Sequence, residues 1–290
     1  TEMFKEKLIS RIHNKAKVVP PFKGSIEKAF KNADKVIEAT YTMPHLAHAP
    51  MEVPNALAWV HDGQCDVWAP VQDPQTVQAE IAHFFGFAIE DITINVMMLG
   101  GAFGRKSKSD FVVEAVALSQ KIKAPVQVVW TREDDIQHDF YRVGGFQSVK
   151  GSVDRNGKIV AFEDHFMGMT YKGGRISGSG FRATEFPILN LKNARASKNM
   201  FDIQTSCGPW RAPGANTTAF VIQSFIHELA VKAGRDHLEV LLELMGKPQW
   251  FDQGNIRTLN TGRATDVIKL AAKKANWGRP MPKGHGLGLA

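Results

Sequence analysis

The chain has 290 residues, of which 43% are hydrophobic and 22% charged, so it is long enough for one large or two ordinary globular domains. No apolar run approaches the roughly 18 residues that a membrane-spanning helix needs. The two cysteines, Cys65 and Cys207, are too few for a disulfide framework or an iron–sulfur cluster.

The net charge of +7 is concentrated at the two ends of the chain. Residues 1–35 carry nine basic and four acidic side chains, residues 247–290 carry eight and two, and the 211 residues between them are net acidic. A nucleic-acid-binding protein would instead concentrate its cations on the folded unit, with aromatic residues among them. The pattern argues against nucleic acid and favours contact with another subunit or an acidic partner.

The N-terminal third begins with a basic lead-in segment over residues 1–33, which contains the break Pro20-Pro21. A strand is expected over 36–41, and three prolines keep residues 43–55 extended. His45, His48 and Glu52 lie in that stretch and raise the question of a metal site. Because the prolines prevent the helix that would place them on one face, the pattern favours structural roles for all three.

Residues 72–131 alternate between helix and strand signals, which indicates an α/β or α+β unit. Asp73 and Pro74 form a typical helix start, and Gly86 a typical helix end. The predicted elements are strands over 56–61 and 66–69, a helix over 74–85, a strand over 92–96, a helix starting near 110, a buried strand over 126–130 and an exposed charged loop over 131–135.

A glycine-rich turn follows the strand over 92–96. It contains Gly100, Gly101 and Gly104, then Arg105 and Lys106, and it precedes a helix. Glycines allow positive φ and close approach of another group, while cations and a helix N-terminus favour an anion. The same pattern also fits a tight strand-to-helix turn with solvated basic residues, so both interpretations stay open at this point.

The second half opens with a hairpin over 146–171, whose turn is Asn156-Gly157. A Gly- and Ser-rich stretch covers 172–199, and a second cation-bearing turn at 210–214 leads into a long helix. Further helices are expected over 238–245 and 265–274. The alternating residues 284–290 predict the start of another strand.

Four stretches in order resemble one known family. The run Gly100-Gly101-Ala102-Phe103-Gly104-Arg105-Lys106 is similar to the Gly-Gly-Gly-Phe-Gly-Arg-Arg stretch of molybdenum hydroxylase large subunits, the xanthine dehydrogenase and aldehyde oxidoreductase superfamily. The supporting stretches are 48–52, 130–134 and 210–214 together with 224–230. The resemblance is strongest to the isoquinoline 1-oxidoreductase β-subunit branch, which includes membrane-bound aldehyde dehydrogenases.

The resemblance implies an α+β molybdenum-cofactor-binding domain with mixed sheets and packed helices. Residues 34–246 would form the molybdopterin-binding core, as two α+β subdomains that divide near 145–150. Residues 247–290 would be a linker, a helix and the beginning of a next subdomain that is cut short.

The resemblance also assigns roles to individual residues. Gln72 would donate a hydrogen bond to a molybdenum oxygen, and Arg211 would orient the substrate or the transition state. Ser107 stands where purine-oxidising members have a glutamate, which argues against purine specificity. The implied cofactor-binding residues of this chain are Gln72, Gly100, Gly101, Ala102, Phe103, Gly104 and Arg105.

The family's general base lies in a C-terminal part that has no counterpart here, so no base or metal ligand can be assigned in this chain. Glu52 and Glu114 are conceivable substitutes, but a structural role is favoured for each. By resemblance, the intact enzyme would hydroxylate an aldehyde or N-heterocycle with water-derived oxygen, using molybdopterin in its cytosine dinucleotide form.

The resemblance implies partners and a location as well. Electrons would pass to a [2Fe–2S] subunit or a cytochrome c subunit, and the rest of the large subunit would complete the site. The complex would lie in the bacterial periplasm or on a membrane facing it, with the cytoplasm as the alternative. On its own the chain would be inactive, and a non-catalytic fragment or assembly module that binds no cofactor is the alternative function.

Overall fold

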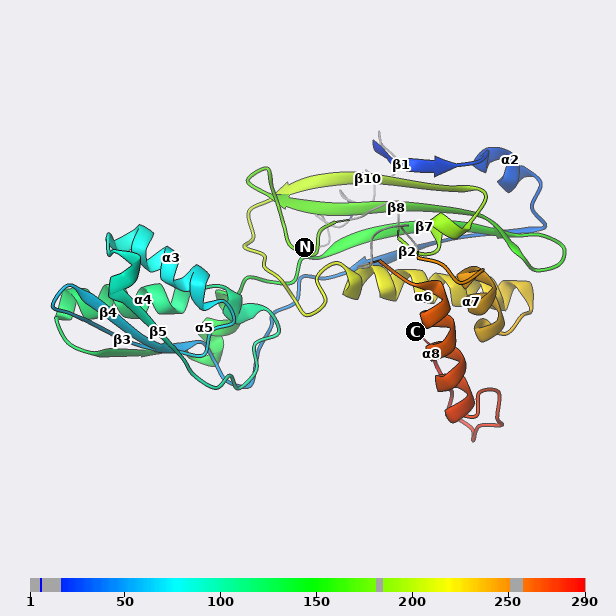
Figure 1. Ribbon diagram of the computed structural model, residues 1–290. Coiled ribbons are helices and arrows are strands. Elements are labelled where there is room, and N and C mark those ends of the chain that lie inside the picture. Colours follow the sequence, from blue (N-terminus) through cyan, green and yellow to red (C-terminus); the bar gives the residue numbers. More distant parts are fainter. Residues whose placement is uncertain (1–5, 7–16, 181–184, 251–257, 290) are drawn as a thin grey trace.

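The computed structural model describes residue 6 and residues 17–180, 185–250 and 258–289, and it has two lobes with a sheet each (Figure 1). The large lobe holds a six-stranded sheet and the small lobe a four-stranded sheet. Both sheets combine parallel with antiparallel pairs and carry packed helices. The predicted α+β class with mixed sheets is therefore confirmed.

The large sheet has the strand order β1-β10-β8-β7-β2, with β9 beside β8. Strands β8 and β10 are parallel, and the other neighbouring strands are antiparallel. The turn between β7 and β8 contains Asn156 and Gly157, as predicted. The strands span Lys17–Lys23 (β1), Lys35–Met43 (β2), Gly145–Val153 (β7), Ile159–Tyr171 (β8), Gly174–Arg175 (β9) and Ala194–Ile203 (β10).

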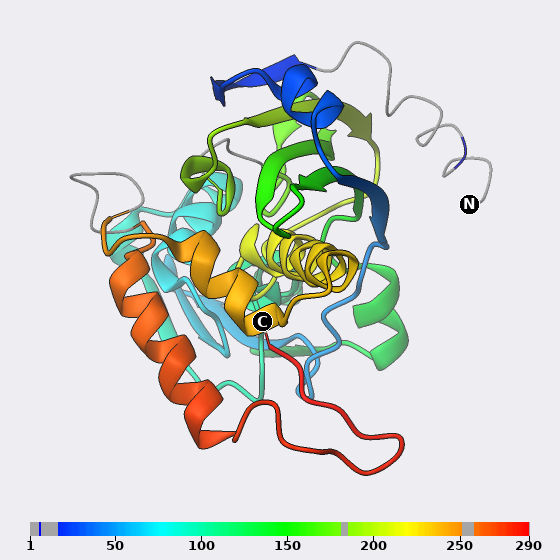
Figure 2. The same ribbon diagram turned by 90° about the vertical axis from the view of Figure 1, so that its right-hand side faces the viewer.

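Helices α6 (Ala215–Ala233) and α7 (His237–Met245) lie along one face of this sheet (Figures 1 and 2). The approach is close, because a side chain at Gly151 on β7 would come within 2.8 Å of Phe225 and Leu229 on α6. Helix α2 (Ile26–Lys31) packs on the opposite face, and α8 (Thr261–Lys274) packs on the outside of α7. A short 3-10 turn, η3, spans Ile188–Asn190.

The small lobe has the strand order β5-β4-β3-β6 and is covered by two helices. The side chain of Asp73 accepts a hydrogen bond from the Thr76 amide at the start of α3, and Gly86 ends that helix in the left-handed conformation. The elements span Asn55–His61 (β3), Gln64–Ala69 (β4), Pro74–Phe85 (α3), Ile89–Asp91 (η1), Ile92–Val96 (β5), Arg105–Ser107 (η2), Asp110–Ile122 (α4) and Val126–Val129 (β6).

The small lobe is an insertion into the large one, between β2 and β7. Where the chain leaves and re-enters the large lobe, Leu46 and Arg142 exchange two backbone hydrogen bonds, of 3.2 and 2.9 Å. The hydrophobic cores of the two sheets share no residue. The structure thus places β2 with the second half of the chain, whereas the sequence suggested a linear division near 145–150.

Four segments differ from their sequence-based expectation. Residues 17–23, expected in a lead-in, form β1 of the large lobe. Strand β6 lies at the edge of its sheet and leaves Val129 exposed, because it has a single neighbouring strand. The charged stretch after it forms a short helix, α5 (Arg132–Gln137), which Thr131 and Asp134 stabilise as a capping box. Residues 284–289 form no strand.

No helix in the part of the chain that the structure describes is long and apolar enough to cross a membrane.

Candidate cofactor site at the junction of the lobes

The glycine-rich turn of the small lobe and the 209–214 turn of the large lobe meet at the junction of the lobes. The Arg211 amide donates a 2.8 Å hydrogen bond to the Phe103 carbonyl. A Cβ at Gly104 would lie 1.9 Å from the Pro209 carbonyl oxygen, so glycine alone permits this approach. The two cation-bearing turns singled out in the sequence are therefore brought together in space.

At two of the three glycines of this turn, other parts of the protein occupy the space that a Cβ atom would fill. A Cβ at Gly100 would come within 2.6 Å of the Glu52 side chain, and at Gly104 it would meet Pro209, as above. At Gly101 the nearest atom would be 3.5 Å away, and its φ of +102° is what requires glycine. The expectation that these glycines clear space for a ligand is thus wrong for two of the three.

Gln72 faces the glycine turn, as the resemblance requires. Its Oε1 accepts a 3.0 Å hydrogen bond from the Gly104 amide, and its own amide donates to the Lys106 carbonyl at 2.9 Å. Because an amide N–H must meet the oxygen of the side chain, the contact fixes the orientation of the Gln72 carboxamide. Its Nε2 donor has no acceptor among the described residues.

The backbone of the turn presents further free donors. In the described part of the chain, the amides of Gly101, Ala102 and Phe103 donate to no acceptor. Gly101 and Phe103 both have positive φ, at 102° and 56°. Successive amides in turns of this kind form concave sites that suit an anion or an oxo group.

Arg211 carries a free charge at this junction. Its side chain is exposed and makes no ion pair with a described residue, while its backbone is fixed by Phe103 and Asn216. The guanidinium can therefore reach a ligand without losing an internal partner. Its neighbour Trp210 is half-buried and stacks on His48, with ring centroids 4.7 Å apart.

Arg105 and Lys106 are not available to a ligand in this way. Arg105 is fully buried, and its guanidinium donates two hydrogen bonds to Asp110 at 2.8 and 2.6 Å. Lys106 is also fully buried and pairs with Glu52. The prediction that these cations flank a bound anion is wrong for their side chains, because Asp110 and Glu52 neutralise them.

Glu52 and Glu114 have structural partners. Glu52 accepts from the Gly100 amide at 2.8 Å. Burial works against its ionised form, but Lys106, the Gly100 amide and Asn55 together hold the pKa of Glu52 below its ordinary value. Glu114 accepts from the Trp130 indole at 2.8 Å. These contacts agree with the structural interpretation and not with a substitute base.

The two histidines of residues 43–55 point to different partners. His45 Nδ1 accepts from the Gly144 amide at 3.1 Å, and burial lowers its pKa. His48 instead contacts Asp139 and Pro209. No group of three potential metal-ligating side chains is found among the described residues.

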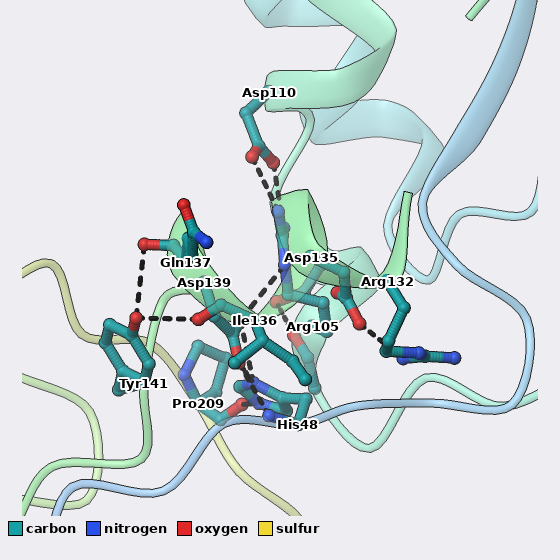
Figure 3. A network of polar contacts seen from close by, with 12 residues as sticks. His48, Arg105, Asp110, Arg132, Asp135, Ile136, Gln137, Asp139, Tyr141 and Pro209 are labelled. Atoms are coloured by element: carbon teal, nitrogen blue, oxygen red, sulfur yellow. Dashed lines mark hydrogen bonds and ion pairs between the residues drawn. The ribbon is translucent and has the colours of Figure 1, made fainter. Parts of the chain in front are cut away.

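One polar network at the junction was not anticipated from the sequence. It joins His48, Arg105, Asp139 and the Pro209 carbonyl, with Arg132 and Asp135 beside it (Figure 3). Asp139 follows α5 and lies 91 positions from His48. No local pattern in the sequence signals such a pair.

Comparisons with known proteins identify the family of the chain. Residues 10–243 match the molybdopterin cofactor-binding domain family. The chain is 26% identical to a membrane-bound aldehyde dehydrogenase [pyrroloquinoline-quinone] of Gluconacetobacter polyoxogenes, over 96% of this chain and 39% of that protein. It is 25% identical to one subunit of the nicotinate dehydrogenase of Pseudomonas putida, over 88% of this chain and 21% of that protein.

Solved structures show the same fold. Quinoline 2-oxidoreductase of Pseudomonas putida 86 aligns with a TM-score of 0.71 and 17% identity, over 88% of this chain and 34% of that chain. Aldehyde oxidoreductase of Desulfovibrio gigas aligns with a TM-score of 0.64 and 18% identity, over 90% and 29%. The chain thus spans about a fifth to two fifths of the relatives named here. It belongs to the molybdopterin cofactor-binding domain family.

Proposed function

We propose that this chain supplies one wall of the cofactor site of a molybdenum-dependent oxidoreductase. One observation carries the proposal: the turns that meet at the junction hold several hydrogen-bond donors without an acceptor among the described residues. They are Gln72 Nε2, the amides of residues 101–103 and the Arg211 guanidinium. Such a group of free donors suits a ligand that presents oxo, phosphate or pterin acceptor atoms.

The residues would divide the work between holding and orienting. The amides of residues 101–103 and Gln72 Nε2 would hold the cofactor beside the turn, since their positions are fixed by the backbone and by Gly104. Arg211 would orient the substrate, because it is the exposed cation on the facing turn. When bound, a molybdopterin centre would supply the two-electron redox chemistry.

We further propose that the substrate is an aldehyde or an N-heterocycle, hydroxylated with water-derived oxygen. The relatives named above, which include an aldehyde dehydrogenase and a nicotinate dehydrogenase, support this choice. Ser107 donates to the Gly104 carbonyl at 2.7 Å and leaves no carboxylate at that position for a purine. The general base would come from the part of the polypeptide that relatives have beyond this region.

The cofactor form, partners and location are proposals on the same basis. The cofactor would be the cytosine dinucleotide form, and a [2Fe–2S] or cytochrome c subunit would receive the electrons. The periplasm, or a membrane facing it, is the proposed location. The nicotinate dehydrogenase relative is named as one subunit of its enzyme, which supports an assembly of several chains.

The test uses the complete polypeptide that contains this chain, purified with its co-encoded subunits from molybdate-replete cells. Elemental analysis for molybdenum, detection of the oxidised pterin, and ¹⁸O transfer from labelled water into the product are measured together. Stoichiometric molybdenum with labelled product is expected. A preparation with pyrroloquinoline quinone or no cofactor would overturn the proposal and favour the non-catalytic module.

A matched pair of variants isolates the role of Gln72. Gln72→Glu keeps an oxygen for the Gly104 amide but replaces the Nε2 donor by an acceptor. Gln120→Glu makes the same change at an exposed position near the far end of α4. Molybdenum content or turnover should fall in the first variant and stay unchanged in the second. Equal behaviour of the two would refute the assignment of Gln72.

A further inference from the structure

A buried histidine–aspartate pair lies between the two halves of the site. His48 Nδ1 is 2.9 Å from Asp139 Oδ2, and the His48 backbone amide donates to the same carboxylate oxygen at 2.6 Å. His48 Nε2 is 2.9 Å from the Pro209 carbonyl oxygen. Both side chains are fully buried. The pair therefore ties the linker before the small lobe to the turn that carries Arg211.

Arg105 connects this pair to the glycine turn. Its Nε forms a 3.0 Å ion pair with Asp139 Oδ1, while its terminal nitrogens bind Asp110 at the start of α4 (Figure 3). The guanidinium also lies 5.3 Å from the ring centroids of Trp130 and Phe140. Because Arg105 directly follows Gly104, its anchored side chain fixes the end of the turn.

The segments held in this way have unfavourable backbone conformations. Phe103, Ala212 and Ala49 have φ values of 56°, 55° and 42°, in the left-handed region that non-glycine residues rarely adopt. Ala49 directly follows His48, Phe103 lies two positions before Arg105, and Ala212 lies three positions after Pro209. Such conformations persist when surrounding contacts over-determine them.

We propose that His48, Asp139 and Arg105, here called the junction triad, are positioning residues. They hold the Trp210–Arg211 turn at a fixed place against the glycine turn, so that Arg211 and Gln72 face one ligand together. The triad holds the two turns together whether or not a ligand is bound. The claim that this placement helps catalysis rests on the proposed function. Preorganisation of this kind lowers the cost of ordering the site when a ligand binds.

The triad does not act on substrate directly. His48 and Asp139 side chains have no solvent-exposed surface, and both ring nitrogens of His48 already face oxygen atoms. A carbonyl oxygen accepts only, so His48 Nε2 carries a proton in this contact. The ring is thus occupied as a donor to Pro209 and is not free to exchange a proton with a substrate.

The test compares His48→Phe with a closely matched control. Phenylalanine keeps a flat ring against Trp210 and the backbone hydrogen bond to Asp139 but loses the ring contacts with Asp139 and Pro209. His61 also stacks on a tryptophan, Trp59, and also pairs with a carboxylate, Asp66, but it lies in the β3–β4 hairpin. His61→Phe therefore removes the same kinds of contact away from the junction.

Amide hydrogen exchange of the 290-residue chain is the first measurement. His48→Phe should raise exchange at least tenfold in peptides that contain the Arg211 and Gly104 amides, and leave peptides from β3, β4 and β5 unchanged. His61→Phe should leave the junction peptides unchanged. Unchanged exchange at the junction in His48→Phe, or a uniform rise along the whole chain, would overturn the proposal.

A conservative variant provides a second measurement. Asp139→Asn keeps the shape and can still bind the His48 ring and amide, but it removes the charge opposite Arg105. Because the contacts with His48 remain while Arg105 loses its partner, we expect junction exchange in this variant to lie between the wild type and His48→Phe. Exchange as fast as in His48→Phe would show that the geometry of the pair does not hold the turn.

The loaded complete enzyme separates this proposal from the proposed function. If it carries the cofactor, His48→Phe should lower kcat at least tenfold while molybdenum content and the KM for a small substrate change less than twofold. A wild-type enzyme purified without cofactor would refute the proposed function. The hydrogen-exchange experiment would still show whether the junction triad holds the Arg211 turn in place. A wild-type kcat in His48→Phe would refute the positioning role.

Discussion

Gly104→Ala tests the contact on which the site geometry depends. The new Cβ would lie 1.9 Å from the Pro209 oxygen and 2.7 Å from its carbonyl carbon, so the two turns must separate by roughly 1 Å. That shift would lengthen the 2.8 Å bond from the Arg211 amide to the Phe103 carbonyl beyond hydrogen-bonding range. It would also pull Pro209 from His48.

The expected cost can be assembled from these parts. Positive φ in a non-glycine residue costs about 1–2 kcal/mol, and each lost hydrogen bond costs about 1 kcal/mol. Gly104→Ala should therefore lower the free energy of unfolding by about 3–4 kcal/mol. Urea unfolding followed by circular dichroism measures this, with a midpoint lowered by roughly 1–2 M for a slope of about 2–3 kcal/mol/M.

Gly63→Ala supplies the control, because Gly63 also has positive φ, at 81°, but nothing lies within 4 Å of its added Cβ. It should lower the free energy of unfolding by the backbone penalty alone, about 1–2 kcal/mol. If Gly104→Ala were no more destabilising than Gly63→Ala, the two turns would not approach as described.

Three further predictions concern charged groups. Glu52→Gln should lower the free energy of unfolding at neutral pH by about 2 kcal/mol, because buried Lys106 loses its charged partner. The pKa of Glu52 is lowered in the folded state, so the stability that this carboxylate contributes is present above the ordinary value of 4.5 and is lost as pH falls below it. In urea titrations across that range, the variant should therefore lose less stability with falling pH than the wild type. Burial raises the pKa of Asp164 from 3.8 to about 8, against a hydrogen bond from Gln147, so the folded state retains a proton that the unfolded state releases. The free energy of unfolding of the wild type should therefore fall as pH rises from about 4 to 8. Asp164→Asn should remove this pH dependence and be the more stable protein near pH 8. A wild-type urea midpoint that does not change with pH would contradict the raised pKa. Arg211→Ala should change the free energy of unfolding by less than about 0.5 kcal/mol but lower kcat/KM of the complete enzyme roughly tenfold or more; a large loss of stability would show that Arg211 has an internal role.

Local features of the fold were predictable because their causes lie within a few residues. The Asp73 cap, the Gly86 helix end and the Asn156-Gly157 turn each follow from the conformational preferences of single residues. The proximity of Gln72, the glycine turn and Arg211 was also expected, through the family resemblance. For the cap, the helix end and the hairpin turn, the relevant signal is short and contiguous.

The features that were missed depend on contacts between distant segments. Arg105 is basic in the sequence, and only the fold shows that Asp139 and Asp110 neutralise it. Strand β1 pairs with β10, so residues 17–23 gain a structural role from a strand far along the chain. The apolar strand over 126–129 lacks a second neighbour, which sequence hydrophobicity does not reveal.

The paired linkers at Leu46 and Arg142 have a consequence for how the molecule can be altered. They hold the two ends of an insert of about a hundred residues side by side. The two hydrogen bonds between the linkers therefore close the loop out of the large sheet, whichever sequence forms the insert. Since the two cores share no residue, substitutions within one core need no compensation in the other. The small lobe can therefore be exchanged for a related one as a module, provided that the graft keeps Gly104 opposite Pro209.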